Sequence, residues 1–273
     1  MFVQKHQRRE YGVAVLGKAL TLLEALAEGQ LGLTDLSRRT QIQKTSAFRI
    51  LSTLESRGYV VKDGQDRTYL PGPKLVALSA AFLSGLKIIQ YARPVLEAVH
   101  AELGETVNLG VLNGHRVLYI DMLESPQGLR MAAQVGSQDS LHCTALGKAI
   151  LSCLSPEELK RLLTGYDWER RTRRTITTID ALERDLARIR HRGYAIDDDE
   201  NELGARCVGV PIRGSSGRPI AALSVSGPAS RLRHSLMSRI GKRLLLAGQE
   251  VERHMGRETH PDGRMLQGER KTH

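Results

Sequence analysis

One stretch of the sequence, Leu33 to Val60, constrains the fold more than any other. It reads LTDLSRRTQIQKTSAFRILSTLESRGYV and contains two short helical patterns on either side of a tight break. We expect the first helix to be N-capped by Thr34 and to run through Arg39, with Leu36 turned inward. The second helix is expected from about Lys44 to Arg57. Its apolar residues recur at i, i+3, i+4 and i+7, which places one face in a core: Ala47, Ile50, Leu51 and Leu54.

The segments on both sides of this stretch complete a small domain. A helix is expected before it, because apolar residues from Leu16 to Ala27 recur at helical spacing and Gly29 follows as a C-terminal cap. After it, YVVKDGQDRTYLP contains two short β-prone runs around the turn Asp63-Gly64. Three helices followed by a hairpin form a winged helix-turn-helix. We predict this domain over residues 11–73, after a disordered arm at residues 1–10.

The exposed side of the second predicted helix is polar and basic. In a helix-turn-helix this helix lies in the major groove of DNA, where its first turns contact bases and phosphates. Arg and Lys pair with guanine, and Thr and Ser donate to phosphate. An ordinary solvated face is the alternative, but such a face needs neither an exposed Phe nor a wing. The predicted DNA-binding residues are Thr34, Lys44, Thr45, Ser46, Phe48 and Arg49, together with Lys62 and Arg67 on or beside the wing.

The net charge of +10 favours a polyanionic partner only weakly. The excess of basic over acidic residues is +4 over residues 1–73, +5 over 74–250 and +1 over 251–273, so it is not concentrated in the predicted DNA-binding domain. Three cysteines, and a basic start that lacks an apolar core, are typical of a reduced cytoplasmic protein without a secretory leader. The apolar runs are too short for a membrane span.

The pattern of expected helices and strands changes after residue 73. We expect a linker helix over 74–92, then an α/β domain over 93–250. A helical pattern starts after Pro73, and a further helix is expected from about Ile88 to Leu103. In the α/β domain helical segments alternate with strand pairs such as TVNLGVLNGHRVLYIDML, which turns at Asn113-Gly114. From residue 251 to 273 the chain is polar and lacks periodicity, which predicts a flexible tail. The predicted fold class is therefore α+β.

Two motifs of the α/β domain indicate a site for a small anion. LHCTALGKAIL places Cys143 and Thr144 just before a helix, so that backbone N–H groups near Ala145 face outward at the positive end of the helix dipole. In AALSVSGP, Ser224 and Ser226 lie two residues apart on a strand and therefore face the same side. Together these motifs predict a pocket for a small carboxylate.

The sequence resembles the IclR family of bacterial transcription regulators from about Tyr11 to Ala247. Beside the helix-turn-helix, the resemblance rests on GETVNLGVL, GLRMAAQVGS, LHCTALGKAIL, RGYAIDDDENELGARCVGVPI and AALSVSGPASRL. It implies a winged helix-turn-helix joined by a linker helix to a GAF-like effector-binding domain, in homodimers and often dimers of dimers. The sequence departs from the family at three positions. Gln41 and Gln43 replace a turn Gly and a Pro, and Phe48 stands at a commonly polar position.

The resemblance also implies which residues bind an effector. In similar domains the small-acid pocket uses the start of one helix, an aspartate, a cysteine and two serines, and this chain matches all of them in type. Met131, Met122 and Leu141 are candidates for the apolar lining. The predicted effector-binding residues are Met131, His142, Cys143, Ala145, Leu146, Asp197, Cys207, Ser224 and Ser226.

The same residue types are compatible with two other chemistries. His142 and Cys143, oriented by an aspartate, are the residue types of a Cys–His nucleophile, as in an enzyme that processes a small acid. With Cys207 they are also zinc-ligand types, but the spacing has no CxxC or HxxxH character. We therefore predict no catalytic site, no metal and no cofactor. The basic run 170–174 and the acidic run 197–200 are expected to be solvated surface, with Asp197 as the exception.

These patterns together predict a cytoplasmic, ligand-responsive and sequence-specific DNA-binding transcription regulator. We expect it to sense a small organic acid, to control a catabolic operon, and to read a palindromic operator as a homodimer or a dimer of dimers. The alternative is a DNA-binding protein that ignores small molecules.

Overall fold

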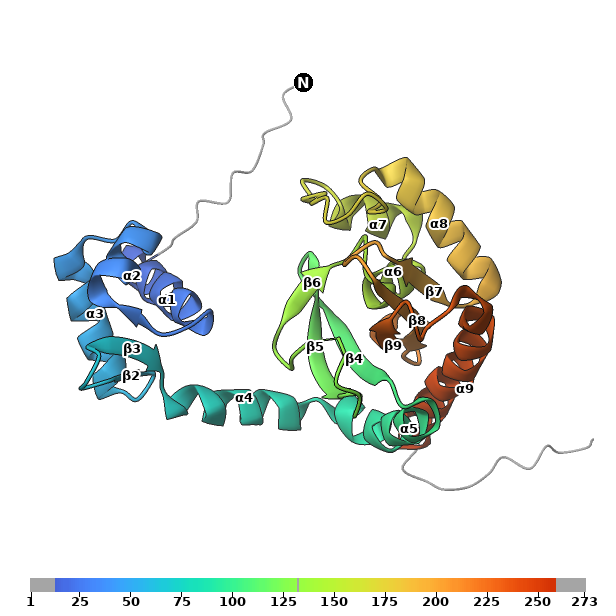
Figure 1. The fold of residues 1–273 in the computed structure, drawn as a ribbon, viewed down its shortest axis with the longest axis horizontal. Coiled ribbons are helices and arrows are strands. Elements are labelled where there is room, and N and C mark those ends of the chain that lie inside the picture. Colours follow the sequence, from blue (N-terminus) through green and yellow to red (C-terminus); the bar gives the residue numbers. More distant parts are fainter. Residues whose placement is uncertain (1–12, 132, 259–273) are drawn as a thin grey trace, which may run out of the picture. The chain divides into compact units, whose positions relative to one another are not determined.

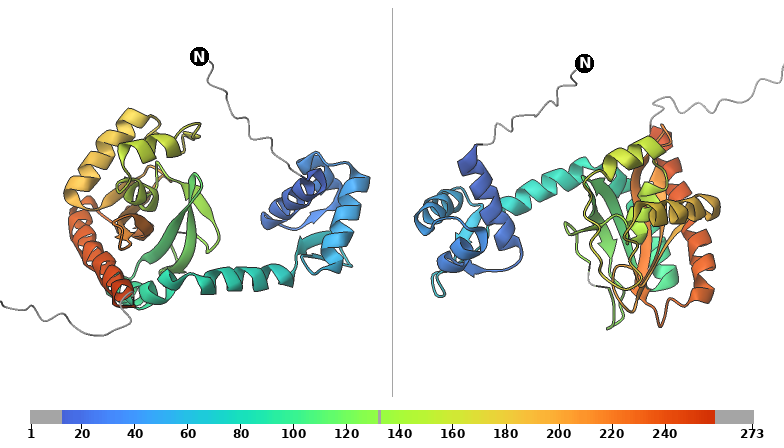
Figure 2. Two further views of the ribbon diagram at one scale, coloured as in Figure 1. Left: turned by 180° about the vertical axis from the view of Figure 1, so that it is seen from behind. Right: turned by 90° about the horizontal axis from the view of Figure 1, so that it is seen from above.

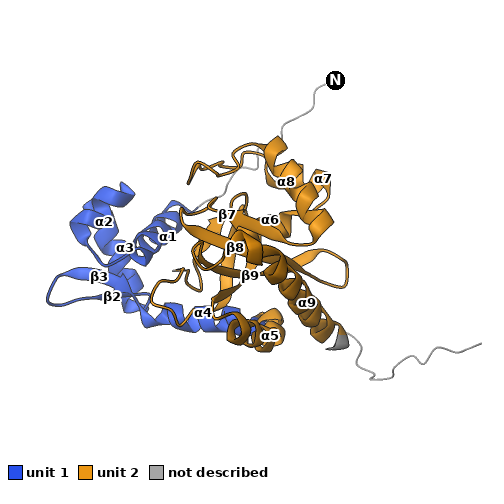
Figure 3. Cartoon of the chain, turned by 45° about the vertical axis from the view of Figure 1, so that its right-hand side comes forward, with its two compact units in different colours: residues 1–85 blue, residues 86–273 orange. Residues whose placement is uncertain are grey.

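The structure is a computed structural model that describes residues 13–131 and 133–258. It divides into two compact units, Met1–Gly85 and Leu86–His273, which are coloured separately in Figure 3. The predicted fold class is confirmed, because the first unit is a winged helix-turn-helix and the second an α/β unit. The predicted arm at residues 1–10 lies outside the described residues. Within the described residues no single helix is long and apolar enough to span a membrane; only α4 and α5, defined below, reach that length and composition when taken together.

The first unit contains three packed helices and a three-stranded antiparallel sheet in the order β1-β3-β2 (Figure 1). Its core is apolar and includes Leu22, Leu36, Ala47 and Tyr69. The inward faces predicted for the two helices of the helix-turn-helix are confirmed at Leu36, Ala47 and Leu51, whereas Leu16 and Leu20 of the preceding helix are exposed. The elements of the winged helix-turn-helix are α1 (Ala14–Ala27), β1 (Leu31–Gly32), α2 (Leu33–Thr40), α3 (Lys44–Ser56), β2 (Val60–Lys62) and β3 (Thr68–Pro71), and α4 follows them in the same unit.

The turn between α2 and α3 forms without the glycine common in similar sequences. Gln41 adopts a left-handed conformation with φ of 57°, and its side-chain Nε2 donates to the carbonyl of Arg38 at 2.8 Å. Glutamine is therefore accommodated in a conformation that glycine adopts more easily. The predicted capping role of Thr34 is wrong, because α2 begins at Leu33 with Gly32 as its N-cap.

The linker helix ends before the predicted boundary at residue 92, and the further helix predicted from about Ile88 to Leu103 is confirmed. Helix α4 spans Pro73–Gly85 and helix α5 spans Lys87–Leu103, with a break at Leu86. Helix α4 has no buried residue, whereas α5 buries an apolar stripe in the second unit. The two helices differ in burial, because only α5 contributes side chains to a core. These are Ile88, Ala92, Val95, Leu96 and Val99.

The second unit is built on a six-stranded antiparallel sheet with the order β6-β5-β4-β9-β8-β7. The strands are β4 (Thr106–Asn113), β5 (Arg116–Leu123), β6 (Gln138–Ser140), β7 (Ala195–Asp198), β8 (Ala205–Arg213) and β9 (Pro219–Pro228). The helices after α5 are α6 (Ala145–Leu151), α7 (Pro156–Leu162), α8 (Ile179–Arg192) and α9 (His234–Glu258).

Helices cover both faces of this sheet (Figure 2). A Cβ added at Gly209 would lie 2.8 Å from the backbone of Ala145, so Gly209 faces α6 and lets it approach closely. A Cβ added at Gly248 of α9 would lie 3.4 Å from the side chain of Val210. Because successive residues of a strand face opposite sides, α6 and α9 lie on opposite faces of β8.

The predicted flexible tail begins too early. Helix α9 continues to Glu258, and Leu244, Ala247 and Val251 are completely buried along it. Their spacing of three and four residues is helical, so the last turns of α9 belong to the core. The rest of the predicted tail, residues 259–273, lies outside the described residues.

Candidate functional site

A row of polar side chains crosses three strands on the α6 face of the sheet. Asp197 on β7 is paired with Cys207 on β8, which is paired with Ser226 on β9. Directly paired residues project to the same face, so the three side chains lie next to one another. Ser224 and Asn108 form a second, parallel row on β9 and β4. The alternation of buried polar residues along these strands thus gathers them under one helix.

A cavity of about 330 Å³ lies over this face. Seven of the predicted effector-binding residues line it: Met131, Ala145, Leu146, Asp197, Cys207, Ser224 and Ser226. Nine polar residues that the sequence did not indicate line it as well: Asn108, Tyr119, Arg130, Ser137, Gln138, Asp139, Arg171, Asn201 and Glu202. These residues belong to elements that are far apart in the sequence, so no single motif contains them.

Asp197 is a buried carboxylate at the wall of this cavity, with 1% of its surface exposed. Its Oδ1 accepts the backbone N–H groups of Glu200 at 2.8 Å and of Asn201 at 3.3 Å. Burial raises the pKa of Asp197 to about 6, although Lys148 and these hydrogen bonds act in the opposite direction. The ionised form is therefore held in an environment that disfavours charge.

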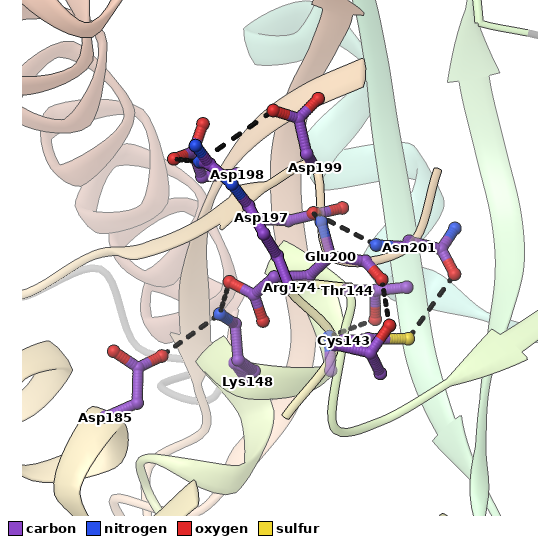
Figure 4. Close-up of polar contacts among 12 residues, drawn as sticks. Cys143, Thr144, Lys148, Arg174, Asp185, Asp197, Asp198, Asp199, Glu200 and Asn201 are labelled. Atoms are coloured by element: carbon purple, nitrogen blue, oxygen red, sulfur yellow. Dashed lines mark hydrogen bonds and ion pairs between the residues drawn. The ribbon is translucent and has the colours of Figure 1, made fainter. Parts of the chain in front are cut away.

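A fully buried lysine lies behind Asp197 (Figure 4). Lys148 Nζ lies 2.5 Å from Glu200 Oε1 and 3.0 Å from Asp185 Oδ2. Burial alone lowers the pKa of Lys148, but Glu200 and Asp185 raise it overall, so the lysine stays charged. Burial raises the pKa of Glu200 to about 7. The expectation that Glu200 is solvated surface is wrong. It instead fixes the turn whose N–H groups bind Asp197.

The two serines share a partner on the neighbouring strand. Asn108 Nδ2 donates to Ser226 Oγ at 3.0 Å and to Ser224 Oγ at 3.3 Å. A hydroxyl can accept and donate at once, so each serine hydrogen is left for another acceptor. Both serines line the cavity, and an oxygen of a bound ligand is an acceptor of the right kind.

His142 and Cys143 lie outside the lining, contrary to prediction. His142 is completely buried, with Nδ1 2.8 Å from the Tyr166 hydroxyl and Nε2 3.1 Å from the carbonyl of Glu169, and its ring packs against Trp168. The Cys143 thiol donates to Asn201 Oδ1 at 3.4 Å, and burial raises its pKa to about 12. A nucleophilic cysteine needs a lowered pKa, so this pair serves packing. The candidate apolar residues Leu141 and Met122 also lie outside the lining.

The start of α6 is less open than the sequence indicated. Thr144 is its N-cap, and Thr144 Oγ1 accepts the backbone N–H of Gly147 at 3.1 Å. That N–H is therefore already paired. Gly147 is required for another reason, because a Cβ there would lie 2.4 Å from the carbonyl oxygen of Leu141.

The basic run 170–174 is not merely solvated. Arg171 lines the cavity, and Arg174 pairs with Asp198 (Figure 4). Thr172 and Thr175 are buried and donate to the backbone carbonyls of residues 199 and 200. The loop is thereby attached to the turn that follows β7.

The predicted DNA-binding residues lie on the recognition helix and the wing of the first unit. Lys44, Thr45, Phe48 and Arg49 are exposed on α3, and Phe48 has 48% of its surface exposed. Ser46 is half-buried, and Thr34 is exposed on α2. Lys62 Nζ lies 5.8 Å from the centre of the Tyr69 ring, and Arg67 adopts a φ of 54° in the wing turn.

No group of three or more potential metal ligands occurs among the described residues.

Comparisons with known proteins extend over both units. The model of the IclR helix-turn-helix domain matches residues 15–64, and that of the bacterial transcriptional regulator IclR C-terminal matches residues 80–253. The HTH-type transcriptional regulator BhcR of Paracoccus denitrificans is 35% identical over 241 residues, which cover 88% of this chain and 86% of that protein.

Two solved structures are similar over most of the chain. The IclR of Thermotoga maritima is 32% identical, with a TM-score of 0.73, and the match covers 90% of this chain and 100% of that one. An IclR homolog from Microbacterium hydrocarbonoxydans, complexed with 4-hydroxybenzoate, is 26% identical with a TM-score of 0.77, and the match covers 89% and 99% of the two chains.

Proposed function

The chain belongs to the IclR family of bacterial transcriptional regulators, which bind DNA and are not enzymes, and from this premise we propose that it is a regulator controlled by a small organic acid. The observation that carries the proposal is the cavity in the second unit, where two serine hydroxyls, a buried carboxylate and two arginines converge. We further propose that it acts in the cytoplasm and controls a catabolic operon.

The donors of the cavity support an acid as its ligand. Ser224 and Ser226 have hydroxyl hydrogens left to donate, and Arg130 and Arg171 bring guanidinium groups to the same space. Hydrogen bonds from charged donors to a carboxylate are roughly twice as strong as neutral ones. One similar protein was solved with 4-hydroxybenzoate, which is itself a carboxylate.

The exposed side of α3 supports sequence-specific DNA binding by the first unit. Lys44 and Arg49 project from its first turns, where recognition helices contact bases and phosphates. Lys62 and Arg67 on the wing supply further positive charge for the backbone. Because such contacts release counterions, log affinity should fall linearly with log salt concentration.

Helix α4 supports assembly into a homodimer. It has no buried residue, yet Val76 and Phe82 have 72% and 52% of their surfaces exposed. A second copy of the chain would cover these side chains and provide a second recognition helix. Two such helices suit a palindromic operator with half-sites about one helical turn apart. We also propose that such dimers pair into a dimer of dimers.

Control by a ligand requires that the ligand bind two arrangements of the protein with different affinity. A coupling of about 1–3 kcal/mol, or roughly 5- to 150-fold in DNA affinity, is the usual scale. The cavity and its buried ion cluster are the elements through which an acid would favour one arrangement.

The test is DNA binding with and without acids. Fluorescence anisotropy would compare the region upstream of the protein's own gene with random duplex, in the presence of a panel of small carboxylic acids. We expect specific binding, and at least one acid that changes it. The Ser224→Ala/Ser226→Ala double variant should bind DNA normally and lose the response. Ser215→Ala/Ser216→Ala, in the exposed turn of the same hairpin, is the matched control.

Two outcomes would contradict the proposal. If the protein does not prefer its own upstream region, it is not a sequence-specific regulator of that region. If specific binding is seen but no acid alters it, the protein is a ligand-independent DNA-binding protein. A double serine variant that still responds would move the acid site elsewhere.

A further inference from the structure

Phe48 is a large apolar side chain that α3 leaves exposed to solvent, with 48% of its surface accessible. The other apolar residues of this helix pack inward: Ala47, Ile50 and Leu51 are buried, and Leu54 packs against the same core. Phe48 is not among the residues of that core. An aromatic ring stabilises a fold most when it is buried, so the packing of the first unit does not account for a phenylalanine at this position.

The ring stands among polar residues of the recognition helix. Helix α3 begins at Lys44, so Phe48 lies in its second turn. Residues three and four apart are neighbours on a helix surface, which makes Lys44, Thr45 and Ser52 the neighbours of Phe48 along α3. Lys44 and Thr45 are exposed as well. Phe48 therefore belongs to the part of a recognition helix that contacts base edges in the major groove.

The hollow between α1 and α3 lies on another side of the helix. Its volume is about 710 Å³, its lining includes Ser46, Arg49 and Thr53 of α3, and Phe48 does not belong to that lining. At 3.6 residues per turn, Phe48 lies roughly 140–160° around the helix from Ser46 and Thr53. The exposed cations near Phe48 are Lys44 and Arg49 on the same helix. This charge suits a polyanion, so DNA is the partner that fits the surface around Phe48.

Phenylalanine can read only one feature of a base pair in the major groove. Its side chain has no hydrogen-bond donor or acceptor for the polar groups of a base edge. Guanine, adenine and cytosine present only donors and acceptors there, whereas thymine also presents a C5-methyl group. An apolar ring among base edges leaves polar groups unpaired unless it meets this methyl group. The chemistry of the side chain therefore selects thymine.

We infer that Phe48 makes operator recognition depend on the C5-methyl group of a thymine, one in each half-site, through an apolar contact in the major groove. The inference rests on the proposed function, in which α3 reads DNA as part of a homodimer. It adds the base that is read and the residue that reads it. Phosphate contacts by Lys44 or Arg49 release counterions, whereas a contact between Phe48 and a methyl group releases none.

The experiment is a uracil scan of the DNA with the unmodified full-length protein. DNase protection first locates the bound site in the region upstream of the protein's own gene. Each thymine of that duplex is then replaced in turn by deoxyuridine, which pairs with adenine and lacks only the methyl group. Burial of one methyl group corresponds to roughly a three- to ten-fold change in the dissociation constant. We expect a loss of that size at one thymine in each half-site by fluorescence anisotropy, and the same loss at low and at physiological salt.

Two variants assign the contact to Phe48. Phe48→Ala removes the ring from an exposed position, so it should bind the thymine duplex about three- to ten-fold more weakly and lose its sensitivity to deoxyuridine at those positions. Val61→Ala is the matched control, because Val61 is an exposed apolar residue of the wing, with 44% of its surface accessible. Its sensitivity to deoxyuridine should equal that of the unmodified protein. Circular dichroism would confirm that both variants are folded.

Three outcomes would overturn the inference. If a site is protected but no replacement of thymine by deoxyuridine weakens binding, no methyl group is read, and sequence-specific regulation survives. If Phe48→Ala remains as sensitive to deoxyuridine as the unmodified protein, another residue reads the methyl group. If no site in the upstream region is protected, the inference fails together with the proposed sequence-specific DNA binding.

Discussion

Replacing Asp197 by Asn should stabilise the protein at neutral pH. Burial raises the pKa of Asp197 from its ordinary value of 3.8 to about 6, and the side chain is 1% exposed, so solvent screens it little. Each tenfold change in proton affinity corresponds to about 1.4 kcal/mol. The ionised carboxylate therefore costs the folded state roughly 3 kcal/mol at pH 7.5, and Asn removes this cost.

The pH dependence gives the prediction its sign. A carboxylate whose folded-state pKa is raised contributes stability that is present below 3.8 and is lost as the pH rises through about 6. Asn has no such dependence. The advantage of Asp197→Asn should therefore fall from about 3 kcal/mol at pH 7.5 to about 1.5 kcal/mol at pH 5. The backbone N–H groups of Glu200 and Asn201 keep an oxygen partner in the variant.

Urea unfolding followed by tryptophan fluorescence is the appropriate measurement. Trp168 is the single tryptophan and packs against the core of the second unit, so it reports the unfolding of that unit. Asp198→Asn is a control with the opposite sign. Partial burial raises the pKa of Asp198, but the bond to Arg206 and neighbouring charges lower it overall, so its ionised form stabilises the fold. The reasoning is refuted if Asp197→Asn is no more stable at pH 7.5, or if its advantage is the same at pH 5.

Three further predictions concern other parts of the chain. Gly147→Ala should lower the free energy of unfolding of the second unit by about 1–3 kcal/mol, because the added Cβ meets the backbone of Leu141; Trp168 fluorescence in urea would show it, and an unchanged midpoint would contradict it. Gln41→Gly should stabilise the first unit by about 0.5–1 kcal/mol, since glycine adopts the left-handed conformation without cost. Its helical circular dichroism should melt at a higher temperature, and a lower one would show that the side-chain bond to Arg38 matters more. Arg49→Ala should weaken specific operator binding by about 1–3 kcal/mol. In anisotropy, an equal loss on random duplex would assign Arg49 to phosphate instead.

Where the sequence prediction failed, the deciding contacts were outside the local segment. Thr34 has a good N-cap side chain, but α2 begins one residue earlier at Leu33. The linker was assigned to residues 74–92, whereas α4 ends at Gly85 and α5 begins at Lys87, where its burial in the second unit starts. Val251 looked like the start of a tail until its burial against the sheet unit was visible.

The residues of the cavity also divide into those that a local sequence pattern predicts and those that it does not. Ser224 and Ser226 were identified from a local rule, the two-residue period of a strand. Asp197, Cys207 and Met131 were identified through family resemblance, and the structure places all of them in the lining. Asn108 and Arg171 were missed because nothing local distinguishes an asparagine in a strand or an arginine in a basic run. His142 was predicted to bind the effector, but its ring lies among Tyr166 and Trp168, outside the lining.

The winged helix-turn-helix can be predicted from the amino-acid sequence alone, because helical periodicity, turn residues and the exposed basic face of α3 are properties of short segments. The family can be predicted in the same way, because motifs along most of the chain are read directly. The row formed by Asp197, Cys207 and Ser226, and the position of Lys148 between Asp185 and Glu200, become visible only in the folded unit. Those neighbours follow from strand order and helix packing. Such contacts depend on the burial of the whole unit, and no local pattern specifies them.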